Sequence, residues 1–454
     1  MARMVAARTV SPVELVDNAL ARINEVNDKL NAFCFVWDDA REAATHAADA
    51  VSAGRPLGPL HGVPIALKDT TPTAGRTTTF GSRCFEHFVP EHDAAIVAAL
   101  QRAGAIVVGK TTTPEFASSL YTDSPLWGPT LNPWNLERSP GGSSGGSGAA
   151  VASGCVPLAE GSDMGGSVRI PASWCGVVGL KPGIGRIPMD ALPALFDSIS
   201  HHGPLARNVD DARLFLRCAQ GPDDADIQSL ITPLDLTGRH PTDLTNVRVA
   251  LSIDLGGWSV DRAVEHNIRA AAAAMADAGA TVVEVQPGLR RTLEDDWRQL
   301  WAVFMATYFG PLVSKFENVM TPTVLSLIRT GQAMSAVEYK RVEFARTEMW
   351  QAIRPILADA DVLLSPTMAS GPVSPRIPDT APLPGGDPVY TPDMALIWNL
   401  IPQCPAITIP VGLDGEGLPV GAQLIGQRWR SDSLLDIAAA LEAVVTPIGR
   451  PPLA

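Results

Sequence analysis

Apolar and polar residues recur along this chain in blocks that favour helices followed by short buried strands. The first block begins with Ser11-Pro12-Val13-Glu14, a capping box with proline at the first helical position, and continues with apolar residues at helical spacing. A second helix, capped by Asp93 and ending at Gly104, leads directly into the apolar strand 105–108. This succession predicts an α/β unit.

The same alternation continues towards the end of the chain. Further apolar runs predict strands at 247–251, 281–283, 362–364 and 406–409. Helical stretches lie between and after them, as at 262–278 and 433–445. We therefore expect the α/β class, with a central mixed and twisted β-sheet flanked by α-helices on both sides.

Two segments depart from this rhythm. Residues 289–356 are helical in pattern and rich in aromatic residues, among them Trp297, Trp301, Phe304, Tyr308, Phe309 and Phe316. These helices either form a cap over a site or simply pack their aromatic side chains onto the core. Residues 365–393 are rich in proline and predict a long surface loop. No internal repeat is visible, so we treat residues 1–454 as a single domain.

Composition and charge narrow the range of partners. The 454 residues are 46% apolar, enough for a large core, and the net charge is -13. No basic run is present, which argues against binding to nucleic acid or to an anionic membrane. Residues 1–11 lack the apolar stretch of a signal peptide, and no apolar run approaches the roughly 20 residues of a membrane-spanning helix. We expect a cytoplasmic monomer or homodimer that acts on a small molecule.

Cysteine and histidine spacing predicts neither disulfides nor a metal site. The six cysteines are scattered without a Cys-x-x-Cys pair, so we expect free thiols. The eight histidines include the adjacent pair His201-His202, whose side chains point apart in a helix or a strand, and no His-Glu-x-x-His spacing occurs. No metal and no cofactor are expected.

Two glycine-rich serine motifs, Gly141–Ser147 and Gly161–Ser167, carry the candidate chemistry. Hydrolysis of an amide requires an activated nucleophile, stabilisation of the oxyanion and a proton donor. An oxyanion hole needs backbone N–H groups that converge on one point, which the glycine-containing turn of the second motif supplies at Met164, Gly165, Gly166 and Ser167. Ser167 is therefore the preferred nucleophile.

A lysine upstream of these motifs supplies a candidate base. Lys68 follows the apolar, strand-like stretch 63–67, where burial penalises the charged form of the amine. A pKa lowered towards neutrality allows such an amine to accept a proton at neutral pH. The sequence therefore predicts a serine hydrolase that uses lysine rather than histidine.

The lysine and the two serine motifs stand at intervals that resemble those of the amidase signature family. Lys68 and Ser143 are 75 residues apart, and Ser143 and Ser167 are 24 apart. The resemblance covers nearly the whole chain, with further matching segments at 61–64, 104–111, 168–171, 175–182 and 418–421. It implies the amidase signature fold and an acyl-enzyme on Ser167. It also implies that Ser143 follows a cis peptide and relays protons between Lys68 and Ser167.

Two rival motifs are disfavoured. Gly104–Thr111 matches the string of a phosphate-binding P-loop, yet its Ala-Ile-Val-Val centre is typical of a buried strand and Pro114 interrupts the following turn. Ser143 and Ser144 both satisfy Gly-x-Ser-x-Gly, but α/β-hydrolases place their catalytic histidine late in the chain, and the last histidine here is His266. A histidine-dependent esterase is the alternative that mutation of Lys68 tests.

Departures from the family pattern concern the substrate rather than the triad. They lie at Met164, Thr112 and Thr70, and Met164 adjoins the expected oxyanion hole. Trp174 either shapes the acyl pocket or packs in the core. We expect cleavage of a small or medium, hydrophobic or aryl, amide or carbamate.

Two alternatives for the function stay open. If the substrate is a carbamate, the main activity is that of a urethanase. The triad does not separate this activity from that of an amidase, because carbamate hydrolysis needs the same attack and the same oxyanion stabilisation. The second alternative is the glutaminase subunit of a tRNA-dependent amidotransferase, which works with a partner. The region Gly185–Pro204 lacks the Tyr-Gly and Ser-Ser-Leu-Asp pattern of that subunit.

Overall fold

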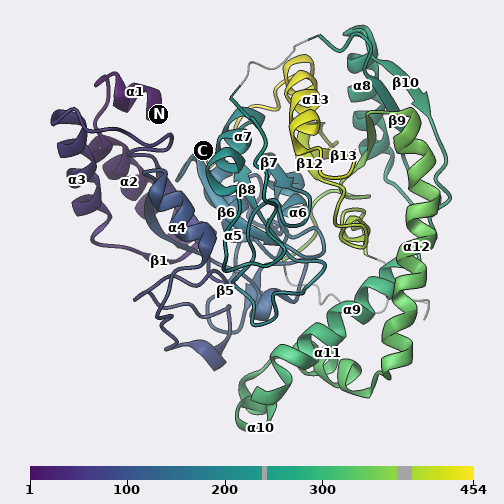
Figure 1. Cartoon of the computed structure of the whole chain (residues 1–454), viewed down its shortest axis with the longest axis horizontal. Coiled ribbons are helices and arrows are strands. Elements are labelled where there is room, and N and C mark those ends of the chain that lie inside the picture. Colours follow the sequence, from purple (N-terminus) through teal and green to yellow (C-terminus); the bar gives the residue numbers. More distant parts are fainter. Residues whose placement is uncertain (238–242, 376–390, 454) are drawn as a thin grey trace.

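The computed structural model describes residues 1–237, 243–375 and 391–453, and these residues build an 11-stranded sheet with helices on both of its faces (Figure 1). Across the sheet the strands follow the order β1 (Phe33–Val36), β3 (Ile106–Thr111), β2 (Pro64–Lys68), β6 (Leu158–Asp163), β8 (His201–Ala206), β7 (Val178–Lys181), β12 (Ala406–Leu413), β13 (Pro419–Gly426), β11 (Val362–Pro366), β9 (Arg248–Leu251) and β10 (Thr281–Glu284). β2 is parallel to β3 and β6, and β9 is parallel to β10 and β11, whereas the pairs between β6 and β11 are antiparallel. The predicted mixed sheet is therefore confirmed.

Alternation along the buried strands gives each face of the sheet its own layer of helices. In β2, Ile65 and Leu67 pack with one layer and Ala66 packs with the other. The first layer consists of α4 (Ala95–Arg102), α7 (Val209–Ala219), α8 (Arg262–Asp277) and α13 (Ser431–Val444). The second consists of α2 (Pro12–Leu30), α3 (Ala40–Ser52), α5 (Gly145–Ala152), α6 (Arg169–Cys175), α9 (Leu293–Tyr308) and α12 (Ala336–Asp359). Lys68, which follows Leu67, is thereby directed to the face of Ala66 and α5.

Shorter elements complete the described chain. A two-stranded sheet pairs β4 (Asp123–Ser124) with β5 (Gly128–Pro129). The short helices are α1 (Ala2–Ala6), α10 (Val313–Phe316) and α11 (Pro322–Ala333). Single 3-10 turns are η1 (Arg83–Phe85), η2 (Glu115–Ala117), η3 (Gly310–Leu312), η4 (Glu317–Val319) and η5 (Leu396–Asn399).

The starts of two helices test the capping predictions. At α2 the capping box is present, with the Ser11 backbone N–H donating to the Glu14 carboxylate at 2.7 Å. The prediction that Asp93 caps the next helix is wrong, because the Asp93 carboxylate accepts from the backbone N–H of Ala74, which lies before η1, and not from an N–H of α4. The first N–H of α4, on Ala95, instead donates to the carboxylate of Asp190 at 3.0 Å. Asp190 is 95 residues further along the chain, so no local pattern identifies it.

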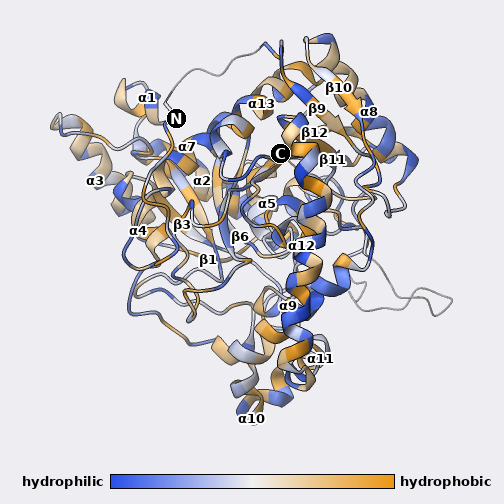
Figure 2. Ribbon diagram, turned by 45° about the vertical axis from the view of Figure 1, so that its right-hand side comes forward, coloured by the Kyte–Doolittle hydropathy of each residue, from blue (hydrophilic) through white to orange (hydrophobic). Residues whose placement is uncertain are grey.

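The helices α9 to α12 follow one another and project from one end of the molecule (Figure 1). α9 and α12 carry both hydrophobic and hydrophilic residues, as amphipathic helices do (Figure 2). Trp301 and Phe304 of α9 pack with Val324 of α11, and Phe309 stacks on Phe116 of the main body with 4.0 Å between ring centroids. None of the helices in the described part of the chain is long and apolar enough to cross a membrane.

The segment for which we expect a proline-rich loop, 365–393, begins inside the sheet. Ser365 and Pro366 are the last residues of β11, because they pair with Gln423 and Ala422 of β13. The three residues that follow, 367–369, are buried. Residues 376–390 of this segment lie outside the described residues.

The contact between α4 and Asp190 gives a prediction about stability. We expect Asp190→Ala to lower the free energy of unfolding by about 1 kcal/mol, because it leaves the first N–H of α4 without its acceptor. Asp190→Asn keeps an acceptor oxygen and is expected to lose less. Urea unfolding followed by circular dichroism measures both values, and equal losses in the two variants would contradict a capping role.

Candidate active site

Lys68 and Ser143 meet on one face of the sheet. Lys68 is the last residue of β2, and Ser143 lies in the loop that leads into α5, where the Gly142–Ser143 peptide is cis as the resemblance implied. Both side chains are almost completely buried. The Lys68 amine donates to the Ser143 hydroxyl at 2.7 Å. The structure thus joins two residues that stand 75 positions apart.

Ser167 lies beside this pair, in the turn between β6 and α6. The backbone N–H of Ser144 donates to the carbonyl oxygen of Ser167 at 3.1 Å, so the two serine motifs are in direct contact. Ser167 is partly exposed, unlike Lys68 and Ser143. Among the described residues, no hydrogen bond joins its hydroxyl to Ser143.

The electrostatic surroundings of Lys68 favour a neutral amine. Burial lowers the pKa of Lys68 from its ordinary value to about 7, although the negative charges of Glu160 and Asp163 act in the opposite direction. The amine has a second hydroxyl partner, Ser162, at 3.0 Å. Near neutral pH this lysine can therefore both accept and return a proton.

The predicted oxyanion turn has one N–H group that is already used. The backbone N–H of Gly166 donates to the Asp163 carboxylate at 2.9 Å. Among the described residues, no hydrogen bond is found from the N–H groups of Met164, Gly165 and Ser167. The N–H of Gly166 therefore supports the turn itself, and an oxyanion hole built from this turn has only the other three N–H groups.

A buried ion pair that the sequence analysis missed supports this turn. The Arg169 guanidinium contacts both carboxylate oxygens of Asp163, at 2.9 and 3.0 Å, and both side chains are fully buried. Burial raises the pKa of Asp163, but the charge and hydrogen bonds of Arg169 outweigh it and hold the pKa well below its usual range. Asp163 also accepts from Val168 N–H at 3.2 Å, and Arg169 donates to Asn399 of η5 at 2.7 Å. The pair therefore connects the turn to β6, α6 and η5.

A second missed cluster lies under Lys68 and is centred on Glu160. One oxygen of this buried carboxylate accepts the backbone N–H of Lys68 at 3.0 Å and the hydroxyl of Thr71 at 2.9 Å. The other oxygen lies 2.8 Å from Nδ1 of His202. Burial raises the pKa of Glu160, but the hydrogen bond and charge of His202 lower it by more than burial raises it, so the carboxylate is ionised. Among the described residues, no group of three or more His, Cys, Asp or Glu side chains is arranged to hold a metal ion.

Helix α9 packs directly on the predicted oxyanion turn. The indole N–H of Trp297 donates to the Met164 carbonyl oxygen at 2.8 Å. A side chain on Gly165 would have no space, because its Cβ would lie 2.3 Å from the Trp297 ring. Trp174, by contrast, is fully buried and stacks on Tyr121, so it belongs to the core.

An apolar pocket reaches Ser162, the hydroxyl partner of Lys68, although Lys68, Ser143 and Ser167 do not line it. Ser162 and Met164 belong to its wall, as do Phe116, Trp301, Phe304 and Phe309. Trp301, Phe304 and Phe309 of the helical segment pack α9 against α11 and also line this pocket. That the segment caps the active site stays a prediction. Thr70, one of the departures from the family pattern, also lines it.

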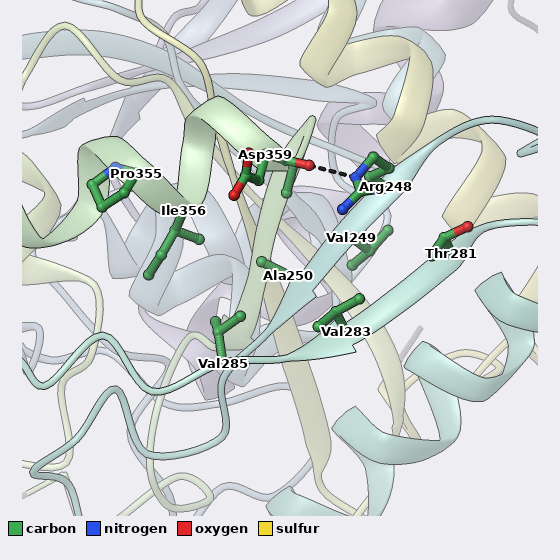
Figure 3. Close-up of a pocket in the computed structure, with 10 residues that line it drawn as sticks. Arg248, Val249, Ala250, Thr281, Val283, Val285, Pro355, Ile356 and Asp359 are labelled. Carbon is green, nitrogen blue, oxygen red and sulfur yellow. Dashed lines mark hydrogen bonds between the residues drawn. The ribbon is translucent and has the colours of Figure 1, made fainter.

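Another hollow, of about 260 Å³, lies between α12 and the sheet edge at β9 and β10 (Figure 3). Val249, Val283 and Ile356 line it, and Arg248 donates to the backbone oxygen of Asp359. Neither the predicted triad nor any predicted oxyanion-hole residue borders this hollow, whereas Met164 borders the apolar pocket, so we do not regard the hollow as the candidate active site.

Comparisons with known proteins relate this geometry to characterised enzymes. Residues 14–435 match the model of the Amidase family. An acylamidase from Rhodococcus erythropolis is 37% identical, over 98% of this chain and 94% of that protein. The glutamyl-tRNA(Gln) amidotransferase from Anaeromyxobacter dehalogenans (strain 2CP-C) contains a subunit that is 35% identical, over 99% of this chain and 96% of that protein.

Solved structures give the same result for the fold. A bacterial aryl acylamidase described as an amidase signature enzyme matches with a TM-score of 0.93 and 28% identity, over 98% of this chain and 95% of that one. The 6-aminohexanoate cyclic dimer hydrolase in complex with its substrate matches with a TM-score of 0.86 and 29% identity, over 100% of this chain and 98% of that one. The similarity therefore spans the sheet, both helix layers and the site.

The buried ion pair gives a prediction about folding stability. We expect Arg169→Met to lower the free energy of unfolding by about 3–5 kcal/mol, because it leaves the Asp163 carboxylate buried without its cation. Arg207→Met is the matched control, since Arg207 pairs with Asp211 at the surface and its loss is expected to cost less than about 1 kcal/mol. Urea unfolding measures both, and equal losses would show that the buried pair has no special structural role.

Proposed function

The chain belongs to the amidase signature family of amide-hydrolysing enzymes, and we propose that it acts through an acyl-enzyme on Ser167, with Lys68 as base and Ser143 as proton relay. The observation that carries this proposal is the buried contact of 2.7 Å between the Lys68 amine and the Ser143 hydroxyl. With a pKa of about 7, a substantial fraction of this amine is neutral at neutral pH and is able to accept a proton.

In the acylation step, the Ser167 hydroxyl oxygen attacks the substrate carbonyl carbon. Its proton passes to Ser143, whose own proton passes to the neutral amine of Lys68. The contact between the two serine hydroxyls that this transfer needs forms when substrate binds, since catalytic hydrogen bonds are often longer in the free enzyme. The substrate carbonyl oxygen becomes an oxyanion, which accepts from the free backbone N–H groups of Met164, Gly165 and Ser167.

The later steps return the protons. As the C–N bond breaks, Lys68 gives its proton back through Ser143 to the leaving nitrogen, and the acyl group stays on Ser167 as an ester. Water then attacks the ester carbonyl and loses a proton along the same route. Release of the acid restores the hydroxyl of Ser167 and the neutral amine of Lys68.

For the substrate we propose a small or medium amide with a hydrophobic or aryl group. The acylamidase and the aryl acylamidase to which this chain is similar support amide cleavage. The aromatic wall formed by Phe116, Trp301, Phe304 and Phe309 supports a hydrophobic substituent. A carbamate would undergo the same attack, followed by loss of carbon dioxide, so carbamates belong in the first substrate panel.

A second candidate function is that of one component of a tRNA-dependent amidotransferase. It is supported by the 35% identity to the glutamyl-tRNA(Gln) amidotransferase component, close to the 37% identity to the acylamidase. The two functions differ in their need for a partner. Glutamine hydrolysis that rises on addition of the other amidotransferase components would favour this candidate, whereas aryl amide cleavage by the isolated chain favours a stand-alone amidase.

The triad proposal predicts the effect of three substitutions. We expect Ser167→Ala to lower kcat/KM for aryl amides by about 1,000-fold or more, because the nucleophile is lost. Ser143→Ala and Lys68→Ala are expected to lower it by about 100- to 10,000-fold, the usual range for loss of general acid–base catalysis. Release of the aryl amine measures all three rates. Full activity in Lys68→Ala would instead indicate a histidine-dependent or other site.

The pKa of Lys68 predicts the pH dependence of the reaction. Below a pH of about 7 the amine is protonated and is unable to act as a base, so kcat/KM is expected to rise about tenfold per pH unit and to level off above pH 7. Lys181 is the matched control, because burial also lowers its pKa to about 7 while its amine contacts the Cys404 carbonyl oxygen. In Lys181→Met we expect kcat/KM to rise with pH as it does in the wild type. If the pH at which kcat/KM rises were different in Lys181→Met, the assignment to Lys68 would be refuted.

A further inference from the structure

Glu160 contacts Lys68 from the neighbouring strand, yet the proposed mechanism gives this carboxylate no role. Its side chain is fully buried in β6, which lies beside β2 in the sheet. One carboxylate oxygen accepts the backbone N–H of Lys68 at 3.0 Å. Two residues further along β6, the Ser162 hydroxyl accepts from the Lys68 amine at 3.0 Å. The strand β6 therefore contacts Lys68 both at its backbone and at its reacting end.

The contacts of the Glu160 carboxylate do not include a permanent cation. Its hydrogen-bond partners are a backbone N–H, a hydroxyl and an imidazole nitrogen, which belong to Lys68, Thr71 and His202. An imidazole N–H donates to a carboxylate from the neutral and from the protonated ring, so this contact does not fix the charge of His202. Within the described part of the chain, no arginine or lysine forms a salt bridge with Glu160. Asp163 differs, because Arg169 pairs with it and offsets its charge.

A negative charge in the core favours the protonated form of a nearby amine. Burial lowers the pKa of Lys68, and of the two charges that raise it Glu160 has the larger effect, ahead of Asp163. The other elements around the amine add little charge of their own. α5 carries no charged residue, while Lys110 of β3 and Asp69 after β2 interact with each other. Glu160 is therefore the main group that opposes the effect of burial on Lys68.

The strength of the base matters because the same amine has to accept a proton and later return it. An amine that is too weak a base does not take the proton from a hydroxyl group. An amine that is too strong a base is already protonated at neutral pH. Burial without a nearby negative charge would make Lys68 a weaker base, so the location of Glu160 beside it has a chemical consequence.

We propose that the buried charge of Glu160 sets the protonation of the Lys68 amine and, through it, the pH range in which the enzyme works. Glu160 is a positioning residue, because it touches the backbone of Lys68 and not the reacting atoms. The effect on the pH range rests on the proposed function, since it acts through Lys68 as the base. The effect on the protonation of the amine does not depend on catalysis and is measured separately.

The substitution Glu160→Gln removes the charge and keeps the shape. The amide oxygen of glutamine still accepts from the Lys68 N–H and from the Thr71 hydroxyl. We expect the rise of kcat/KM for an aryl amide to move to lower pH by about one unit or more, because the protonated amine loses its stabilisation. A purely structural role of Glu160 would lower the activity at every pH and leave the position of the rise unchanged.

Nuclear magnetic resonance measures the protonation of the amine directly. The chain has six lysines, of which Lys68, Lys110 and Lys181 are buried, so isotope labelling of the lysine Cε carbons gives few signals. The signal that is lost in Lys68→Met belongs to Lys68. In Glu160→Gln we expect the titration midpoint of Lys68 to fall by about one pH unit or more, and that of Lys110 to fall as well. Lys181 is the internal control, because Glu160 is not among the charges that shift its pKa.

A second variant separates charge from disruption of the cluster. Thr71→Val removes a hydroxyl that donates to the same Glu160 oxygen, but it changes no charge. We expect the midpoint of Lys68 in Thr71→Val to equal that of the wild type. Circular dichroism checks the folding of each variant. If Glu160→Gln fails to fold, Glu160→Met, which has a similar length and no charge, provides the same comparison.

The outcomes separate the role of Glu160 from the proposed function. An unchanged midpoint of Lys68 in Glu160→Gln would overturn the inference, whatever the activity of the variant. A midpoint that falls equally in Thr71→Val would also overturn it, because the charge would then not be the cause. If the midpoint of Lys68 falls but the rise of kcat/KM does not move, Glu160 controls the amine and Lys68 is not the base, so the proposed function fails. A matching fall in both supports the inference and the proposed function together.

Discussion

The conformation of the turn between β6 and α6, which carries Ser167, depends on one buried carboxylate, that of Asp163. It accepts from the backbone N–H groups of Gly166 and Val168 and from the guanidinium of Arg169, so one charge centre holds the turn, β6 and α6 together. Burial raises the pKa of Asp163, but Arg169 lowers it by more. The carboxylate therefore stays ionised throughout the pH range in which Lys68 titrates, and the turn keeps its shape while the amine changes its charge.

A lowered pKa does not by itself mark a base in this molecule. Burial lowers the pKa of Lys110 to about 8 and that of Lys181 to about 7, close to the value for Lys68. The amines of Lys110 and Lys181 donate to backbone carbonyl oxygens within the core. Lys68 differs because its partner Ser143 belongs to a motif that contacts the partly exposed turn of Ser167. This contact with the serine motif, and not its pKa, distinguishes Lys68 from the other two lysines.

The sequence predicted those features that short segments encode. Continuous apolar runs indicated the buried strands β2 and β3, and the glycine-containing turn indicated Ser167 as the candidate nucleophile. Long-range partners were not predictable in this way, since a carboxylate in one segment gives no local sign of the group that it binds. Glu160 binds His202 from a neighbouring strand, and α4 is capped by Asp190 instead of the adjacent aspartate. The role of Ser143 was predicted from the resemblance to a family, because the family motif includes this serine. The resemblance gave no information about the long-range contacts.

Helix α9 contacts both the aromatic pocket and the turn between β6 and α6 that carries Ser167. Trp297, Trp301 and Phe304 follow one another at intervals of four and three residues, so they lie on one face of the helix. Their rings stack in sequence, at 5.8 and 4.9 Å between centroids. Trp297 holds the Met164 carbonyl at one end of this stack, while the other two rings line the pocket. A shift of α9 would therefore move the Met164 peptide, so in the proposed mechanism the fit of a substituent in the pocket and the stabilisation of the oxyanion would depend on the same rigid element.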